Sequence, residues 1–477
     1  MKLWIAGKWC DGTPREIKNP FNQTGAGIVH DANSAQVEEA LETSEKAFRK
    51  FTKTSRFTRS RLLALMAEGL KKNRSPLVAE IINQAGKPFA AADVEVTRAI
   101  GTFTIASEEA KRIGGDMTPI DIDAGGKPFS PALSYWVGRG PVFGISPFNF
   151  PLNLAAHKVA PALAAGVSII LKPPPQAPGP AIILGKIFEE AVKEGSLDEI
   201  PLGTLQILNC SNELAERAAT DPRIQILSFT GSAKVGWHLQ SKAVGKKIIL
   251  ELGGNAAVIV NEDADLKRAA SRCAVGSFTY SGQVCISVQR IFVHEKVRNE
   301  FTNLFLKEVE KLQIGDPSNK DTIIGPVIDS GAAVRIKSWI DESVKNGAKI
   351  LFGGKNEGNV LFPTILTNTK ASDKVVCEEV FGPVVVLESF GEFSEAVGKV
   401  NDSKYGLQAG VFTDSAKLIH EATTHLEVGG IIINEIPMFR ADNMPYGGIK
   451  ESGLGREGVK FTMEEFCERR TVITWNG

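Results

Sequence analysis

The feature that most constrains the fold is an alternation of short apolar strands with helical stretches. Between Gly138 and about Leu250, strands are expected at residues 142–145, 167–171, 205–208, 224–229 and 247–250, with helices between them, for example over 178–193. A second alternating region runs from Ala256 to about Asn434, with strands expected at 257–260, 290–293, 384–387 and 431–433. Strands separated by helices are joined by crossover connections and lie parallel. The sequence therefore predicts an α/β protein with parallel sheets.

The segments outside these regions have a different character. Residues 34–112 show helical periodicity, with Ser34 as the expected N-cap, whereas residues 1–30 read as short strands and turns. Residues 117–138, which contain Gly125-Gly126, are expected to form a β-hairpin that leaves the main body, and the strand-like residues 470–475 are expected to pair with it. Such an excursion often serves subunit contacts. We therefore expect a homodimer or homotetramer.

Composition excludes several classes of partner. The chain of 477 residues has 55 Lys and Arg against 55 Asp and Glu, which favours neither nucleic acid nor an anionic membrane. Its six cysteines are scattered without a C-x-x-C, so we expect no disulfide framework and no metal site. The N-terminus lacks the apolar core of a signal peptide, and the longest apolar run, 159–171, is too short to span a bilayer. A cytoplasmic location is expected.

Polar residues follow two of the expected strands where ligands bind in α/β sheets, at the carboxyl ends. Ser146-Pro147-Phe148-Asn149-Phe150-Pro151 follows the strand at 142–145, and Asn149 is an amide donor held between aromatic residues. Because asparagine is common in turns, a plain turn is the alternative. Lys172 follows the next strand and begins a loop stiffened by three prolines, so it offers a cation at this edge.

Two further strand ends carry unusual residues. Phe229-Thr230-Gly231-Ser232 runs directly into a helix, and a helix N-terminus with glycine and serine suits a phosphate. Glu251 lies between two leucines in Leu250-Glu251-Leu252-Gly253-Gly254-Asn255. A carboxylate there is either poorly solvated, and so a candidate base, or exposed at the rim.

Cys285 lies in the glycine-containing loop Ser281-Gly282-Gln283-Val284-Cys285-Ile286-Ser287, between an expected helix and a strand. Gly282 has no Cβ, so the loop can bring backbone N–H groups close to a small substrate. Cysteine is also among the most buried residue types, so a structural thiol is the alternative.

Together these segments form an ordered set. The order Pro-Phe-Asn-Phe-Pro, Lys-Pro, Phe-Thr-Gly-Ser, Glu-Leu-Gly-Gly and Gly-Gln-x-Cys, followed by Glu378-Glu379-Val380-Phe381-Gly382-Pro383, resembles the aldehyde dehydrogenase superfamily from about residue 4 to the C-terminus. The resemblance implies two Rossmann-like parallel-sheet domains and a β-hairpin oligomerisation element. The expected boundaries are 1–117 with 139–250 for the cofactor-binding domain and 251–434 for the catalytic domain. Residues 118–138 with 463–477 are expected to form the oligomerisation element, and 435–462 a return segment.

The resemblance also implies a catalytic set. The Cys285 thiolate would attack the aldehyde carbonyl to form a thiohemiacetal and then a thioester. The Asn149 amide and the backbone N–H of Cys285 would stabilise the oxyanion, and Glu251 would activate the hydrolytic water. Lys158 lies where family members have a lysine proposed to relay protons.

A nicotinamide cofactor, NAD or NADP, is implied in the same way. Lys172 would hold the adenosine ribose, Ser232 the pyrophosphate and Glu379 the nicotinamide ribose, with Phe381 near the nicotinamide. The neighbouring residues that complete the expected cofactor site are Ser146, Pro147, Phe148, Pro175, Gly231 and Leu252. Pro175 stands where NAD-preferring relatives often have a glutamate, so we predict that both cofactors bind.

The implied substrate is a small aldehyde. Val284 replaces the arginine that precedes the nucleophile in non-phosphorylating glyceraldehyde-3-phosphate dehydrogenases. Residues 439–448 are similar to those of the lactaldehyde dehydrogenase group. Arg98, His157 and Arg440 are candidates to reach the substrate tunnel and favour a short polar or anionic aldehyde, although such arginines are usually solvated and such a histidine is usually packed.

Two alternatives to this function stay open. A CoA-acylating semialdehyde dehydrogenase would transfer the acyl group to CoA instead of water, but such relatives usually lack the glutamate that Glu251 supplies. A non-catalytic protein that keeps the fold would tend to lose the nucleophile or the base, and Cys285, Glu251 and Asn149 are all present.

Overall fold

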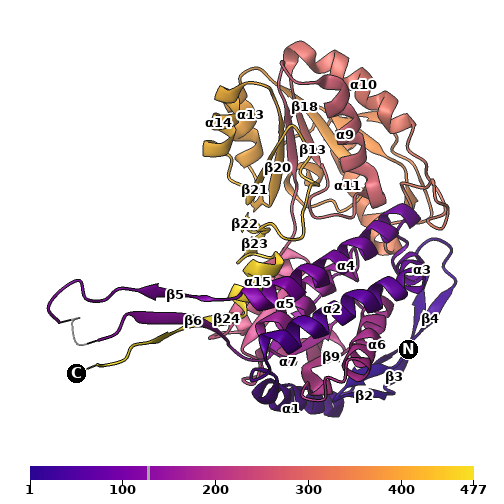
Figure 1. Cartoon of the computed structure of the whole chain (residues 1–477). Helices are drawn as coiled ribbons and strands as arrows, with labels where there is room; N and C mark the ends of the chain where they lie inside the picture. Colours follow the sequence, from indigo (N-terminus) through magenta and orange to yellow (C-terminus); the bar gives the residue numbers. More distant parts are fainter. Residues whose placement is uncertain (126–128, 477) are drawn as a thin grey trace.

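The computed structural model describes residues 1–125 and 129–476, and it has two bodies stacked one above the other (Figure 1). Each body is built on its own largely parallel sheet with helices on both faces. The predicted α/β class with parallel sheets is confirmed. Gly126 of the expected hairpin and Gly477 of the tail lie outside the described residues.

The lower body holds the first alternating region. Its sheet has the strand order β2-β1-β9-β8-β7-β10-β11-β23, and the five strands from β9 to β11 are parallel. The strands are β1 (Leu3–Ile5), β2 (Lys8–Cys10), β7 (Val142–Ile145), β8 (Ile169–Lys172), β9 (Leu205–Ile207), β10 (Ile226–Thr230), β11 (Lys247–Glu251) and β23 (Gly453–Leu454). A separate hairpin, β3 (Thr13–Lys18) with β4 (Gly25–Asp31), lies beside it.

Side chains alternate between the two faces of this sheet, as the period of a strand requires. Ile169 and Leu171 pack in one apolar core with α2 to α6 and α15, whereas Ile170 packs in the other with α1, α7 and α8. The helices are α1 (Ser34–Phe51), α2 (Arg56–Lys72), α3 (Arg74–Ala85), α4 (Phe89–Arg112), α5 (Asn153–Ala165), α6 (Gly179–Glu194), α7 (Asn212–Thr220), α8 (Ala233–Lys242) and α15 (Val459–Glu465). Because both faces are covered, the strands read as continuous apolar runs.

The start of α1 differs by one residue from the prediction. Asn33, not Ser34, is the N-cap: its side chain accepts a hydrogen bond from the Gln36 N–H at 3.0 Å. The Gln36 side chain in turn accepts from the Asn33 N–H, also at 3.0 Å. This reciprocal pair is a capping box, which explains why the helix begins at Ser34 itself.

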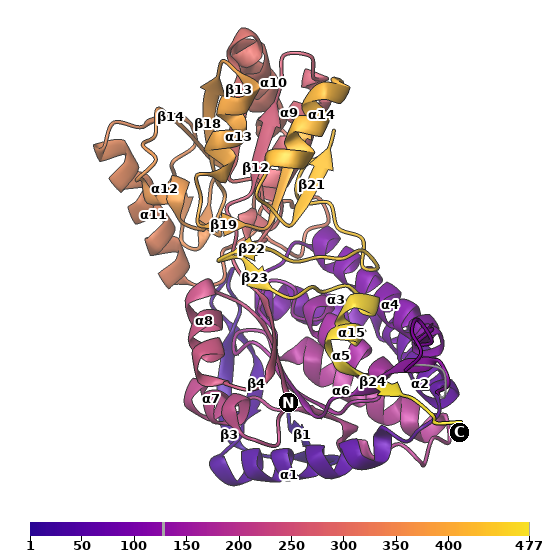
Figure 2. The same cartoon turned by 90° about the vertical axis from the view of Figure 1, so that its left-hand side faces the viewer.

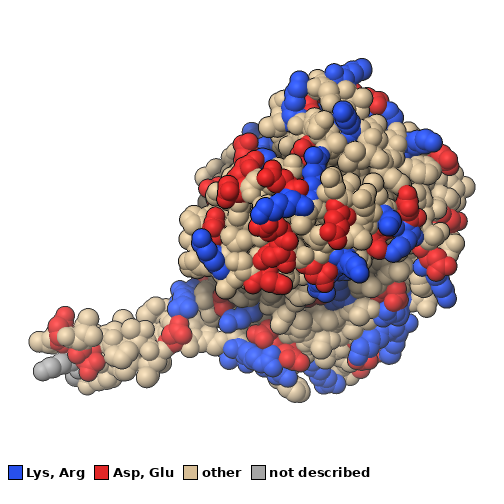
Figure 3. All heavy atoms as spheres, turned by 90° about the horizontal axis from the view of Figure 1, so that it is seen from above, with Lys and Arg blue, Asp and Glu red and all other residues tan. Residues whose placement is uncertain are grey.

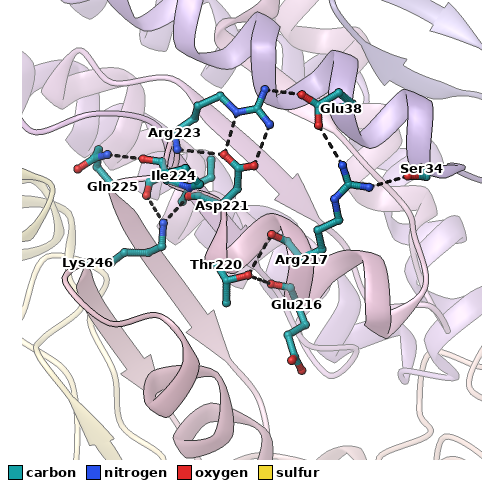
Figure 4. Close-up of polar contacts among 11 residues, drawn as sticks. Ser34, Glu38, Glu216, Arg217, Thr220, Asp221, Arg223, Ile224, Gln225 and Lys246 are labelled. Atoms are coloured by element: carbon teal, nitrogen blue, oxygen red, sulfur yellow. Dashed lines mark hydrogen bonds and ion pairs between the residues drawn. The ribbon is translucent and has the colours of Figure 1, made fainter.

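Ion pairs join α1 and α7 at the surface (Figure 4). Glu38 of α1 lies 2.6 Å from Arg223 and 3.1 Å from Arg217 of α7. Arg223 also pairs with Asp221 at 2.8 Å, and the Lys246 ammonium donates to the carbonyl oxygens of Asp221 and Ile224. The turn before β10 is therefore engaged in these bonds, which is why that strand begins at Ile226 and not at Ile224 as predicted.

The upper body holds the second alternating region. Its sheet has the order β14-β17-β18-β13-β12-β20-β21, with only β14 antiparallel to its neighbour. The strands are β12 (Ala257–Val260), β13 (Arg290–His294), β14 (Lys349–Phe352), β17 (Thr364–Thr367), β18 (Val384–Phe390), β20 (Gln408–Phe412) and β21 (Gly430–Ile433). The helices are α9 (Leu266–Phe278), α10 (Arg298–Glu310), α11 (Ser330–Lys345), α12 (Lys374–Cys377), α13 (Phe393–Asn401) and α14 (Ala416–His425).

Short strands cross between the two bodies (Figure 2). β19 (Tyr405–Gly406) pairs with β22 (Ile449–Lys450), and β23 then joins the edge of the lower sheet beside β11. The chain from 435 to 462 therefore runs from the upper body back to the lower one and passes over the carboxyl end of β11.

The predicted hairpin projects from the lower body (Figure 1). β5 (Gly115–Thr118), β6 (Ala132–Gly138) and β24 (Cys467–Val472) form a three-stranded antiparallel sheet, so the expected pairing of the tail with the excursion is present. This arm carries exposed apolar side chains, among them Met117, Leu133 and Trp475. Elsewhere, both signs of charge are mixed on the face seen in Figure 3.

Candidate active site

Two cavities between the bodies meet at Cys285. The larger cavity, of about 1070 Å³, is lined by the carboxyl ends of β7, β8, β10 and β11 and by residues 378–381 of the upper body. The smaller cavity, of about 480 Å³, is lined by α4, the start of α5, the Cys285 loop and residues 436–446. Cys285 lines both, so a group bound in either cavity can reach the same sulfur.

The loop that carries Cys285 is fixed by its backbone conformation. After α9, Tyr280, Ser281 and Gly282 have φ angles of 53°, 55° and 68°, in the left-handed region. A side chain on Gly282 would collide with the carbonyl of Gly382. The glycine is therefore needed where two chain segments cross. The loop presents the thiol because Gln283 is anchored by an Ile328 N–H at 2.8 Å.

The Cys285 thiol has one close polar partner in the described structure: the hydroxyl of Tyr446 lies 3.1 Å from its Sγ. Enclosure raises the pKa of the thiol to about 11, while the bond to Tyr446 acts in the opposite direction. Cys285 nevertheless lines open cavity space on two sides, unlike the fully buried Cys273. A purely structural thiol would not need that access.

Asn149 lies beside this loop. Its side chain is buried, and its Nδ2 donates to the carbonyl of Gln283 at 3.0 Å, two residues before the cysteine. An amide nitrogen has two hydrogens, and this bond uses one. Since Asn149 also lines the larger cavity, its second hydrogen is available to a ligand oxygen there.

Glu251 ends β11 and is buried, with 3% of its surface exposed, so the alternative of a rim carboxylate is wrong. Neither carboxylate oxygen has a hydrogen-bond partner within residues 1–125 and 129–476. Burial raises the pKa of Glu251 well above its usual value, and the nearby Glu457 carboxylate adds to this. A side chain at Gly447 would come within 2.8 Å of Glu251 Oε1, so this glycine lets the chain pass close to the carboxylate. Such an unpartnered, poorly solvated carboxylate can take a proton from a water in the cavity.

A buried ion network lies behind Glu251. The Lys158 ammonium is 2.7 Å from Thr230 Oγ1 and 3.1 Å from Glu457, and Arg440 reaches the other Glu457 oxygen at 3.2 Å. Burial would raise the pKa of Glu457, but Lys158 and Arg440 outweigh it and lower that pKa to about 2. Glu457 could not be predicted from the sequence, because its role depends on Lys158 and Arg440, which approach it only in the folded chain.

All ten residues expected to hold a cofactor line the larger cavity. They are Ser146, Pro147, Phe148, Lys172, Pro175, Gly231, Ser232, Leu252, Glu379 and Phe381. The buried Ser146 Oγ lacks a partner within the described residues, and Ser232, the N-cap of α8, makes no side-chain capping bond. Both hydroxyls are thus free to bind a ligand.

Glu379 lines the wall of the larger cavity that belongs to the upper body. Its Oε1 accepts the Gly254 N–H at 3.0 Å, and burial raises its pKa to about 7. Phe381 packs edge-on against Phe148, with 5.7 Å between ring centroids, which joins the two bodies across the cavity. The size of the cavity and its free hydroxyls suit an extended polar ligand such as a dinucleotide.

The smaller cavity is cationic. Lys87, Arg98, Arg272 and Arg440 line it, and its lining in the described part of the chain contains no aspartate or glutamate. The carboxylates that pair with these cations are set back from the lining: Glu95 with Lys87, Asp442 with Arg98, Glu435 with Arg272 and Glu457 with Arg440. A small anion in this cavity would meet positive charge on several sides.

The three substrate candidates have different surroundings. Arg98 and Arg440 line the cavity, and the Arg440 side chain is only 7% exposed, so it is not solvated. The Arg440 Nε has no partner among the described residues. His157 is fully buried instead, with its Nε2 2.9 Å from Asp442, which Arg98 also contacts at 2.7 Å. His157 therefore orients Asp442, and through it Arg98.

Neither a metal site nor a membrane span accompanies the two cavities. No group of three or more His, Cys, Asp or Glu within residues 1–125 and 129–476 could hold a metal ion. Over the same residues, every helix is too short or too polar to cross a bilayer.

Comparison with known sequences relates this chain to aldehyde dehydrogenases along its whole length. The model of the Aldehyde dehydrogenase family matches residues 5–472. A 3-sulfolactaldehyde dehydrogenase of Priestia aryabhattai is 40% identical over 473 residues, which cover 99% of this chain and 97% of the relative. A lactaldehyde dehydrogenase of Methanococcus aeolicus is 38% identical over 473 residues, with 99% of each chain covered.

Solved structures of similar fold are also dehydrogenases that act on aldehydes. Aldehyde dehydrogenase 21 from Physcomitrella patens, in complex with the reaction product succinate, superposes with a TM-score of 0.96 at 37% identity and covers 100% of this chain and 98% of that one. Glyceraldehyde-3-phosphate dehydrogenase GapN from Methanocaldococcus jannaschii, complexed with NADP, gives 0.92 at 36% identity over 96% and 98%. A betaine aldehyde dehydrogenase from Staphylococcus aureus in complex with NAD+ gives 0.93 at 29% identity over 100% and 94%.

Proposed function

The chain belongs to the aldehyde dehydrogenase family, an assignment that makes it an aldehyde-oxidising oxidoreductase, and we propose that it oxidises a short anionic or polar aldehyde to its carboxylate through a thioester on Cys285. The observation that carries this proposal is the position of Cys285, which lines both cavities beside the Asn149 amide and the unpartnered Glu251 carboxylate.

In the first half of the reaction, the sulfur of Cys285 bonds to the aldehyde carbon, and the carbonyl π electrons move to the oxygen. The second hydrogen of the Asn149 amide and the Cys285 backbone N–H then stabilise the oxyanion, each worth about 2.7–4 kcal/mol in comparable enzymes. When the carbonyl re-forms, the hydrogen on carbon leaves with its electron pair for the hydride acceptor that the larger cavity would hold, and a thioester remains on Cys285.

In the second half, water attacks the thioester carbon, the C–S bond breaks, and the carboxylate product leaves while Cys285 regains its thiolate. Glu251 takes the proton of that water. Its carboxylate is buried and has no hydrogen-bond partner among the described residues, and burial raises its pKa, which makes it a better base. Glu457 is a poor substitute, since Lys158 and Arg440 hold its pKa at about 2. The presence of Glu251 favours hydrolysis over transfer of the acyl group to CoA.

The larger cavity suits a nicotinamide cofactor, which supplies the hydride acceptor when bound. Lys172 would hold its adenosine ribose, Ser232 its pyrophosphate and Glu379 its second ribose. The rim at Pro175 is close to neutral, because Arg15, which donates to the Pro175 carbonyl at 2.8 Å, is itself paired with Asp31 at 2.6 Å. We therefore propose that NAD and NADP both serve; a hundredfold difference in kcat/KM between them would contradict this.

The cationic smaller cavity supports an aldehyde with a distal anionic group. Arg440 offers an unpartnered Nε, and Arg98 lies on the same wall. Among relatives, one is named for a sulfonated lactaldehyde, and a similar structure holds succinate. A volume of about 480 Å³ fits a chain of a few carbons with such a group.

The direct test is to incubate the protein with succinate semialdehyde, sulfolactaldehyde, lactaldehyde and propanal, each with NAD and with NADP, and to follow reduced cofactor. Cys285→Ala should abolish turnover, and the acyl group should appear on Cys285 by mass spectrometry when the reaction is quenched. Full turnover by Cys285→Ala, or acyl-CoA as the product when CoA is present, would contradict the proposed reaction.

Substrate choice is tested with Arg440→Leu. Loss of a charged hydrogen bond should lower kcat/KM for succinate semialdehyde by about 10- to 100-fold relative to propanal. The ratio of the two substrates is the measurement, because general damage to the site affects both. Unchanged turnover of lactaldehyde and succinate semialdehyde would rule out Arg440 as a substrate contact.

We also propose that the arm of β5, β6 and β24 pairs with another copy of the chain to give a dimer or tetramer, since it exposes Met117, Leu133 and Trp475. Six unpaired cysteines support a reducing compartment such as the cytoplasm. Light scattering of the protein, compared with a variant carrying Leu133→Lys, tests the assembly; an unchanged mass would contradict the role of the arm.

A further inference from the structure

Tyr446 is the one polar side chain that contacts the Cys285 sulfur within the described residues, with its hydroxyl 3.1 Å from Sγ. Its position is held by the backbone, because Tyr446 and Glu457 exchange two N–H···O bonds of 3.0 and 2.7 Å. The side chain is buried, with 3% of its surface exposed, and lines the smaller cavity. The contact is therefore part of a rigid wall and does not depend on a mobile surface side chain.

The direction of this hydrogen bond follows from acidity. Burial raises the pKa of the Tyr446 phenol well above its usual value, so the phenol keeps its proton at neutral pH. The thiol is the group that must lose a proton before it can attack. The phenol is then the donor and the sulfur the acceptor once the thiolate forms.

Arg440 strengthens this donor. The carbon at the centre of its guanidinium lies 3.8 Å from the centroid of the Tyr446 ring, and Glu457 holds Arg440 there at 3.2 Å. A cation over an aromatic face withdraws electron density from the ring and makes its hydroxyl a better donor. Glu457, Arg440, Tyr446 and Cys285 are thus linked in that order by an ion pair, a cation–π contact and a hydrogen bond.

We propose that Tyr446 is a further catalytic residue for the reaction proposed above, whose hydroxyl donates a hydrogen bond to the Cys285 thiolate and stabilises it before the attack on the aldehyde. The bond matters only for the anionic sulfur, because a sulfur that is bonded to the substrate carbon no longer accepts strongly. Tyr446 therefore acts where the sulfur carries negative charge, which is before the attack on the aldehyde and again when hydrolysis of the thioester releases the thiolate.

The test is the rate at which iodoacetamide alkylates Cys285 in the absence of substrate, measured from pH 6 to 10 by the mass of the peptide that contains it. This range lies below the thiol pKa of about 11, so the rate at each pH follows the small fraction of thiolate. For Tyr446→Phe, loss of a hydrogen bond to a charged group should raise the pKa of the thiol by about one to two pH units, which lowers the fraction of thiolate throughout this range. A less acidic thiol gives a more nucleophilic thiolate, so the rate at pH 7 should fall by only about three- to tenfold.

Tyr280→Phe is the matched control. Tyr280 lines the same cavity, but its hydroxyl donates to the Ala85 carbonyl at 3.2 Å. Its alkylation profile should coincide with that of the unmodified protein. The inference would be overturned if the alkylation rates of Tyr446→Phe and the unmodified protein agreed within twofold at each pH. It would also be overturned if Tyr280→Phe changed the rate as much as Tyr446→Phe.

A second measurement covers the case in which Tyr446→Phe does not fold. The chain has four tyrosines, so biosynthetic replacement by 3-fluorotyrosine is practicable. Its phenol is more acidic and a stronger donor, and the alkylation profile should move to lower pH; an unchanged profile would overturn the inference. Turnover by Cys285→Ala would refute the proposed function itself, whereas active wild-type enzyme with an unshifted Tyr446→Phe profile would refute only the role of Tyr446.

Discussion

Replacement of Glu251 by glutamine should separate the two halves of the reaction. The change keeps the shape of a side chain whose carboxylate has no hydrogen-bond partner within the described residues, and it removes only the base. Glu457 cannot take over, because its pKa is lowered to about 2. The full contribution of a general base should therefore be lost, about 10²- to 10⁴-fold in steady-state rate, or about 3–5 kcal/mol of barrier.

Acylation should survive this substitution. The negative charge of Glu251 raises the pKa of the Cys285 thiol, so its removal does not slow formation of the thiolate. In a rapid-mixing experiment with succinate semialdehyde, we expect a burst close to one reduced cofactor per active site, followed by a very slow phase. Glu378→Gln is the matched control, since that half-exposed carboxylate on the cavity rim pairs with Lys404 at 2.7 Å. Loss of the burst, or a steady-state rate reduced less than tenfold, would refute the role of Glu251 as the hydrolytic base.

Three further predictions follow from the same geometry. Asn149→Ala should lower kcat/KM by about 10²- to 10³-fold, because one oxyanion donor is lost; steady-state kinetics with less than a tenfold drop would argue against that role. Cofactor binding should tighten as pH rises through about 7, since Glu379 then ionises and accepts hydrogen bonds from ribose hydroxyls; titration calorimetry from pH 6 to 8 should show this trend, and Glu379→Gln should abolish it. Lys87→Met should lower the free energy of unfolding by about 3–5 kcal/mol, because it leaves the buried Glu95 carboxylate without its cationic partner at 2.5 Å. A free energy of unfolding in urea that changes by less than 1 kcal/mol, out of about 10 kcal/mol for a typical protein, would contradict it.

The secondary structure could be predicted largely from local pattern. The strands at 142–145 and 257–260 lie where the apolar pattern indicated them, and the helix expected before the Cys285 loop is α9. Errors occur where another contact delays an element: β8 begins at Ile169 and not at Val167, because the Val167 N–H bonds to the Ala162 carbonyl at the end of α5. β17 and β20 were missed altogether, since short buried strands carry little signal of their own.

The candidate site could be predicted only as separate strand-end motifs. Because parallel strands end at one edge of their sheet, Ser146, Lys172, Ser232 and Leu252 were expected to lie together, and they do line one cavity. The surroundings of His157 could not be predicted this way. Its spacing on α5 fits either a cavity wall or the packed interior, and only the neighbouring Asp442 distinguishes them.

The sequence by itself therefore determined the α/β class, the two sheets and the identity of the reactive groups, because alternation of apolar residues and the residue types at strand ends are local properties of the chain. The tertiary structure alone decided which charges are paired and which atom contacts the nucleophile. Tyr446 reaches Cys285 across 161 positions of sequence, and Arg440 and Lys158 converge on Glu457 from different elements. A hydrogen bond acts over about 3 Å, a distance that only the packing of the two bodies against each other fixes.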